Sequence, residues 1–226
     1  MKQGILVWDL PVRIFHWSLV GCFALAWLTS ESERYQGIHL LAGYLLLALI
    51  GLRLVWGLVG SRYARFPQFV RGPSAVLGYL RSLLGNKPEH HVGHNPAGAL
   101  AIVLLLLLGL GTGISGWLHF NEIGVDVLEE VHEALASAML ALVAIHVLGV
   151  ALSGWLHKEN LVKAMFTGRK SGEAAAGISR AHGIIALLLV LVLGVLGWNL
   201  VQGTWPALMN PGAVGTGQDH HHGDDD

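Results

Sequence analysis

Five continuous apolar runs are the feature that most constrains how this 226-residue chain can fold. They cover residues 11–29, 37–59, 97–118, 131–156 and 181–201, and each is long enough to cross a hydrocarbon core of about 30 Å as a helix. The runs do not alternate between apolar and polar residues, as the strands of a membrane barrel would. Only 13% of the residues are charged, as expected for an integral membrane protein, and no soluble domain is predicted that could form a self-contained enzyme outside the membrane. We predict an all-α integral membrane protein with five transmembrane helices.

The basic residues indicate the orientation of these helices. If the N-terminus lies in the cytoplasm, all but one of the 14 Lys and Arg residues fall on the cytoplasmic side, the exception being Arg34. The outer connections and the C-terminal tail "DHHHGDDD" are acidic. The N-terminal segment lacks an apolar core and a small-residue cleavage site, so we expect no removed signal peptide. The sequence therefore predicts a cytoplasmic N-terminus and an external C-terminus.

Two long connections lie on the predicted cytoplasmic side. In residues 60–96, Pro73 suits the first position of a helix, an apolar stripe follows, and Gly85 is suited to its end, so we predict a short amphipathic helix on the membrane surface. The connection 157–180 is rich in Gly, Ser and Ala, which indicates a linker. We therefore divide the chain into a four-helix domain, 1–170, and a C-terminal part, 171–226, with linker, fifth helix and tail.

Four of the 13 histidines lie clearly inside predicted spans, at His16, His39, His132 and His146. His132 and His146 are fourteen residues apart, so their side chains leave one helix face about 21 Å apart along the axis. With the spans alternating in direction, His16 matches His146 in depth near the inner surface. His39 matches His132 near the outer surface. The predicted pairs are therefore His16 with His146 and His39 with His132.

Two facing imidazoles at each of two levels suit a planar metal macrocycle held from both sides, as in bis-histidine haem b. Zinc is the competing metal, but it usually takes three or four protein ligands. The single cysteine, Cys22, excludes a CxxCH attachment motif, so the haem would be non-covalent. For any one of these histidines alone, a hydrogen-bonded packing role is an equally good interpretation.

Further residues fit the same interpretation. Gly43, Ala136 and Gly149 lie on the faces of neighbouring histidines and would leave room for the ring, although small residues are also common where membrane helices pack. Arg13 lies three residues before His16, and Arg53 ends the second span. Either arginine would suit a haem propionate, with a role as a membrane-surface anchor as the alternative.

Four stretches together carry a resemblance to a known family: "WDLPVRIFHW", "HLLAGYLLLALIGLRLVWG", "VGHNPAGA" and "VHEALASAMLALVAIHVLGV". Over residues 5 to about 170 the chain resembles the bacterial cytochrome b561 family, which includes the b-type cytochrome subunits of nickel-iron hydrogenases. The resemblance implies a four-helix transmembrane bundle in the bacterial inner membrane that binds two haems b. The four histidines would be the axial ligands, and the C-terminus would be periplasmic. The fifth helix and the acidic tail depart from four-span members and leave the partner open.

The resemblance implies electron transfer between the membrane quinone pool and a partner, either a periplasmic cytochrome c or a membrane-bound oxidoreductase such as hydrogenase subunits. No nucleic acid is expected as a partner. A stand-alone enzyme that reacts quinone with a small species such as superoxide would share every ligand, but it would favour a basic outer face. A non-redox carrier with a histidine ion path would leave the matched depths unexplained. For the fifth helix and His182 at its inner end, we favour packing against a partner helix over a quinone site. For the tail "DHHHGDDD", we favour a solvated segment over a metal-binding site or a docking site for a basic cytochrome c.

Overall fold

The computed structural model describes residues 3–83, 85, 89–124 and 127–202. Five long helices dominate it: α1 (Leu10–Thr29), α2 (Gln36–Val59), α5 (Pro96–Phe120), α6 (Val127–His157) and α8 (Gly183–Val201). They coincide with the five predicted spans to within a few residues, and all five are long and apolar enough to cross a membrane. The predicted all-α, multi-pass membrane architecture is therefore confirmed.

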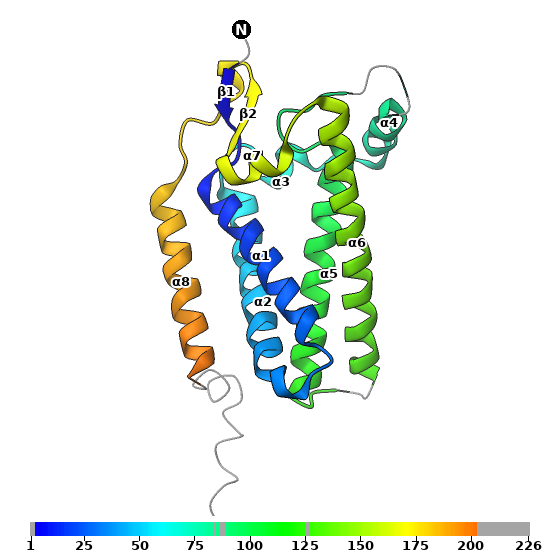
Figure 1. The fold of residues 1–226 in the computed structure, drawn as a ribbon, viewed down its shortest axis with the longest axis vertical. Helices are drawn as coiled ribbons and strands as arrows, with labels where there is room; N and C mark the ends of the chain where they lie inside the picture. Colours follow the sequence, from blue (N-terminus) through cyan, green and yellow to red (C-terminus); the bar gives the residue numbers. More distant parts are fainter. Residues whose placement is uncertain (1–2, 84, 86–88, 125–126, 203–226) are drawn as a thin grey trace, which may run out of the picture.

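The helices pack as two pairs and a peripheral fifth helix (Figure 1). α1 packs along α2, α5 packs along α6, and α2 also contacts α5, which joins the pairs into a four-helix bundle. A single-turn helix, η1 (Glu33–Tyr35), leads into α2. α8 lies against α1 and α2, on the far side of the bundle from α6. The predicted tail "DHHHGDDD" lies outside the described residues.

Side-chain caps fix where several helices begin. Asp9 accepts a hydrogen bond from the backbone N–H of Val12 at 2.8 Å, and Asn95 accepts one from Gly98 at 2.7 Å. A proline follows closely in both cases, which suits a first helical turn because that turn needs no N–H there. Both helices begin at the same end of the bundle.

That end also carries the small elements, and we call it the sheet end (Figure 1). Strand β1 (Gln3–Leu6) pairs antiparallel with β2 (Arg169–Gly172), and the short helices are α3 (Phe66–Phe69), α4 (Pro73–Leu83), α7 (Leu161–Thr167) and η2 (Ala174–Ala176). The predicted amphipathic helix is present as α4, which starts at Pro73. The segment 157–180, expected to be a linker, instead contains α7 and β2. Its strand is too short and too polar to show a period of two residues.

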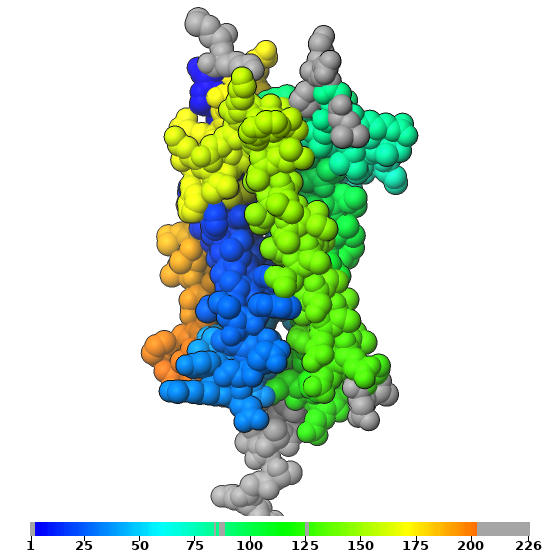
Figure 2. All heavy atoms as spheres, turned by 45° about the vertical axis from the view of Figure 1, so that its right-hand side comes forward, coloured from blue at the N-terminus to red at the C-terminus, as the bar shows by residue number. Residues whose placement is uncertain are grey.

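Small residues allow α2 and α5 to approach closely. A Cβ atom at Gly109 would lie 2.7 Å from Cδ1 of Ile50, and one at Gly113 would lie 2.9 Å from Cδ1 of Leu47. The other two helices of the bundle, α1 and α6, make few contacts with each other. A furrow runs between them on the face shown in Figure 2. These two loosely packed helices carry three of the four histidines under consideration.

Candidate functional site

His39 on α2 and His132 on α6 face each other across the bundle, at the end opposite the sheet end. The centres of their half-buried rings are 6.1 Å apart and the ring planes are inclined at 73°. The sequence predicted that these two histidines lie at the same depth, and in the structure their rings are adjacent.

A hydrogen bond to a backbone carbonyl fixes the orientation of each ring. The Nδ1–H of His39 donates to the carbonyl oxygen of Ala26 at 2.8 Å, and that of His132 donates to the carbonyl oxygen of Thr112 at 2.9 Å. A carbonyl oxygen only accepts, so each Nδ1 carries a proton, and a neutral imidazole of this tautomer has its lone pair on Nε2. The Nε2 lone pairs are then free to bind a metal ion, in the arrangement common for metal-binding histidines.

The spacing of the two rings agrees with one shared metal ion. Bonds from imidazole nitrogen to a metal are about 2 Å long, which puts the ring centres on opposite sides of one ion about 6 Å apart. The observed 6.1 Å meets this requirement. The arrangement therefore fits one iron held by two axial imidazoles.

Gly116 on α5 was not singled out from the sequence, yet it determines where the His132 ring lies. A Cβ atom at this position would lie 2.7 Å from Cε1 and 2.8 Å from Nδ1 of that ring. Both distances are shorter than real Cβ contacts, so only glycine leaves the ring in place. The clustered glycines of "GLGTGISGW" were a signal, but they did not indicate which glycine faces a histidine.

The second predicted pair lies nearer the sheet end. His16 on α1 and His146 on α6 are half-buried and lie within electrostatic range of each other. His16 packs edge-on against Trp17, with ring centres 4.9 Å apart. Its Nδ1 is buried and has no hydrogen-bond partner among the described residues. A buried imidazole nitrogen without a partner among the described residues is consistent with a ligand that the chain itself does not supply.

The predicted spacer glycines border open space. A Cβ atom at Gly43 or at Gly149 would meet no neighbouring heavy atom within 4 Å. This differs from Gly109, Gly113 and Gly116, where a Cβ atom would collide with a side chain. Other glycines, such as Gly21 and Gly51, border open space as well, so the openness allows a planar ring at Gly43 and Gly149 but is not specific to these two positions.

The two arginines occupy different surroundings at the sheet end. Arg13 donates from Nη2 to the carbonyl oxygen of Phe166 on α7, and its Nε has no partner in the described part of the chain. Arg53 is only 6% exposed, donates to the carbonyl oxygen of Ala64 at 3.1 Å and lies over the ring of Phe66. Its Nη1 is likewise buried without a partner among those residues. Each guanidinium therefore keeps a donor available for an anionic group such as a propionate.

Asp9 is a further buried polar residue that the sequence analysis did not single out. Its fully buried carboxylate caps α1 and accepts a hydrogen bond from Nε1 of Trp56 at 3.1 Å. Nδ1 of His182, at the start of α8, lies 4.0 Å from the same carboxylate. The observed surroundings of His182 are thus those of a residue that holds α8 against the bundle.

His94, just before α5, lies between the rings of Trp8 and Phe69, at 4.5 Å between ring centres in both cases. Removal of the ring from water, with a smaller effect of the nearby Arg53 charge, lowers the pKa of His94 to about 3. His94 is therefore neutral at physiological pH. It packs the "VGHNPAGA" segment against Trp8, which follows β1, and against Phe69 of α3.

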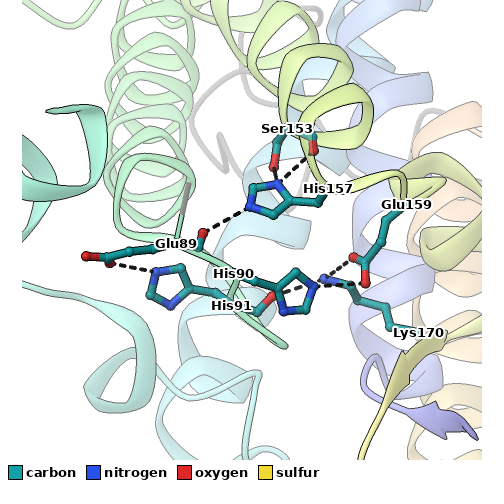
Figure 3. A network of polar contacts seen from close by, with 7 residues as sticks. All are labelled: Glu89, His90, His91, Ser153, His157, Glu159 and Lys170. Atoms are coloured by element: carbon teal, nitrogen blue, oxygen red, sulfur yellow. Dashed lines mark hydrogen bonds and ion pairs between the residues drawn. The ribbon is translucent and has the colours of Figure 1, made fainter. Parts of the chain in front are cut away.

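A polar network links the connection before α5 to the end of α6 and to β2 (Figure 3). Glu159 accepts hydrogen bonds from Nε2 of His90 and from Nζ of Lys170, each at 3.0 Å. Burial alone would raise the pKa of the Glu159 carboxyl, but the hydrogen bonds from His90 and Lys170 and the charge of Lys170 outweigh it and lower that pKa. The ionised carboxylate is thus the central acceptor of this network.

His157, the last residue of α6, belongs to the same network. Its Nδ1 lies 2.9 Å from the carbonyl oxygen of Ser153 and its Nε2 lies 3.0 Å from that of Glu89. His157 thereby connects the end of α6 to the chain before α5.

Replacing Glu159 by Gln is expected to lower the free energy of unfolding by about 2 kcal/mol at pH 7, because the nearly buried Lys170 loses its charged partner. The pKa of Glu159 is lower in the folded state, so its contribution is complete above the unfolded-state pKa of about 4.3 and is lost as the pH falls through the folded-state value. Denaturation in detergent, followed by tryptophan fluorescence between pH 7 and pH 3, measures this loss. Glu89→Gln is the control, since Glu89 is exposed. Equal stability of the two variants would contradict the interpretation.

Comparison with known proteins places this arrangement in a family. The family described as prokaryotic cytochrome b561 matches residues 7–168, which include all four histidines. The probable Ni/Fe-hydrogenase B-type cytochrome subunit of Rhizobium leguminosarum bv. viciae is 23% identical over 215 residues, covering 75% of this chain and 90% of that protein.

The probable Ni/Fe-hydrogenase 1 B-type cytochrome subunit of Escherichia coli K12 is 28% identical over 141 residues, covering 51% of this chain and 60% of that protein. No solved structure matches the chain. The family match extends from the end of β1 to the end of α7 and thus contains the whole four-helix bundle. A multi-pass helical bundle with this match is a b-type cytochrome of electron transport, and the chain belongs to the prokaryotic cytochrome b561 family.

Proposed function

We propose that the protein is a dihaem cytochrome that carries electrons across the bacterial inner membrane between membrane quinone and a redox partner. The observation that carries this proposal is the pair His39 and His132, with ring centres 6.1 Å apart and both Nδ1 atoms occupied by backbone carbonyls. That geometry leaves the Nε2 atoms of both rings available to bind one iron. Haem, when bound, supplies an iron that accepts and releases one electron.

The roles of the chain's own residues follow from their positions. His39 and His132 would hold one haem, and His16 and His146 the other, with α6 contributing one ligand to each. Gly43 and Gly149 would leave space beside the rings, because nothing in the described chain fills it. Of the two arginines predicted for the propionates, we assign Arg53, whose buried Nη1 has no partner among the described residues, to the haem nearer the sheet end. Arg13 borders a separate pocket beside α1.

The direction across the membrane follows from charge. The connections at the sheet end carry most of the basic residues, so we place that end and the N-terminus in the cytoplasm and the C-terminus in the periplasm. The curated relatives carry names of hydrogenase cytochrome subunits. We therefore propose a membrane-bound nickel-iron hydrogenase as the partner in preference to a periplasmic cytochrome c. The separation of the two sites along α6 suits a relay from one membrane surface to the other.

Purified protein is expected to contain about two haems b per chain, because each histidine pair can hold one. The haems should be low-spin and removable with acidified acetone, since the chain lacks a CxxCH motif. Absorbance spectra of the oxidised and reduced protein and quantification of extracted haem measure both properties. A content of one haem per chain would contradict the dihaem part of the proposal. Haem colour that stays on the protein after extraction with acidified acetone would contradict non-covalent binding.

A further inference from the structure

A pocket of about 270 Å³ lies at the sheet end between α1 and α7, at the outside of the bundle. Its lining is mainly apolar and aromatic and includes Arg13, Ile14, Trp17, Ser18, Met165 and Phe166. None of the functions assigned above uses this pocket as a whole. It borders the first turns of α1, one of the five helices long and apolar enough to cross a membrane.

Two residues of this lining have hydrogen-bond donors that the chain leaves unused. Nε of Arg13 and Nε1 of Trp17 are both buried, and neither has a hydrogen-bond partner within the part of the chain that the structure describes. Both groups can only donate. A buried donor without an acceptor is costly, so the missing partner should be a molecule that brings acceptor oxygens into an apolar site.

The aromatic side chains give the pocket a flat wall. Trp17 stacks on Phe166 with ring centres 4.2 Å apart and planes inclined at only 21°. Phe166 is 56% exposed, so its ring can turn to admit a ligand. On its other side Trp17 meets the ring of His16 at 4.9 Å. One side chain therefore connects the pocket to a proposed haem ligand.

We propose that this pocket binds the head ring of a membrane quinone, with carbonyl oxygen as the acceptor for Arg13 Nε and Trp17 Nε1. The assignment rests on the proposed electron-transfer function and specifies where its quinone binds. A flat, neutral ring with carbonyl oxygens matches an apolar pocket that has two hydrogen-bond donors. A lipid phosphate fits less well, because the single guanidinium already donates from Nη2 to Phe166 and the second donor is an uncharged indole.

The test uses the full-length, haem-loaded protein in detergent. The haems are reduced with dithionite, the excess is removed, and oxidation by decylubiquinone or menadione is followed by the loss of the reduced-haem absorbance over a range of quinone concentrations. Trp17→Phe keeps an aromatic ring but removes the N–H, and Ser18→Phe fills the pocket without altering either donor. Trp27→Phe, at the other end of α1, is the matched control. Oxidation by ferricyanide and the haem content are measured for every variant.

We expect Trp17→Phe and Ser18→Phe to raise the quinone concentration for half-maximal rate about tenfold, the loss expected for one buried hydrogen bond or a blocked site. Trp27→Phe should match the unmodified protein, and ferricyanide oxidation should stay unchanged in all variants. Quinone oxidation that is equally fast in both pocket variants would overturn the pocket and leave the proposed function intact.

Two other results would also overturn the assignment. An unmodified protein that reacts with neither quinone would remove quinone from the proposed function, and the pocket assignment with it. An anionic phospholipid that native mass spectrometry finds on the unmodified protein but not on Trp17→Phe, combined with unchanged quinone kinetics, would assign the pocket to a lipid headgroup.

Discussion

Replacing His132 by Ala should lower the haem content from about two to about one per chain, or convert one haem from low spin to high spin. Removal of one axial imidazole opens one iron, whereas the other site lies about 21 Å further along the same helix and keeps both its ligands. His39→Ala should affect the same haem as His132→Ala. His16→Ala and His146→Ala should both affect the other haem. Haem quantification, low-spin spectra and redox titration of the four variants identify which haem each substitution removes.

The exposed His119 on α5 supplies the control, because its replacement by Ala removes a histidine near the same end without removing a proposed ligand. That variant should keep both haems with unchanged spectra. If His16→Ala and His132→Ala perturbed one haem while His39→Ala and His146→Ala perturbed the other, the pairing by depth would be wrong. The 6.1 Å separation of His39 and His132 would then reflect packing alone.

Replacing Gly116 by Ala is expected to weaken low-spin binding of the proposed haem between His39 and His132 by about 10- to 100-fold, although Gly116 is not a proposed ligand. The new Cβ atom would lie 2.7 Å from the His132 ring, which would have to move and would lose its hydrogen bond to the carbonyl of Thr112. The ring would then no longer direct Nε2 toward the iron, and losses of 10- to 100-fold in affinity are typical when such an orienting contact is removed. Haem titration of the apoprotein measures this change.

Gly51→Ala is the matched control, since Gly51 lies in α2 and a Cβ atom there meets nothing within 4 Å. It tests whether an added methyl group in a membrane helix affects haem binding in general. The haem between His16 and His146 should bind normally in both variants. Normal binding of both haems by Gly116→Ala would show that the ring of His132 has room to shift.

The long helices were predictable because a membrane imposes one simple requirement, which is about twenty apolar residues per crossing. The start of α4 at Pro73 also followed from a local rule. By contrast, the sheet of Gln3–Leu6 with Arg169–Gly172 depends on two four-residue segments that are far apart in sequence. Neither segment carries enough pattern to identify the other, so the structured part of 157–180 was interpreted as a linker.

The candidate site was likewise predictable only in part. The periodicity of α6 and the alternation of span direction were sufficient to match His39 with His132, and these rings are adjacent in the structure. The hydrogen-bond partners of both rings are backbone carbonyls of α1 and α5, which carry no residue-specific signal. Gly116 was missed for a related reason, because its importance depends on the rotation of α5 against α6 and not on its own sequence neighbours.

The pairing of β1 with β2 has a consequence for the order of biosynthesis. The strand Gln3–Leu6 is among the first segments made, but its partner Arg169–Gly172 is translated only after α6, about 10–30 s later at typical rates of synthesis. His132 and His146 emerge in the same late interval, so neither proposed haem site can gain its second axial ligand earlier. Attachment of the N-terminal strand and completion of both proposed haem sites therefore depend on the same last stretch of the nascent bundle.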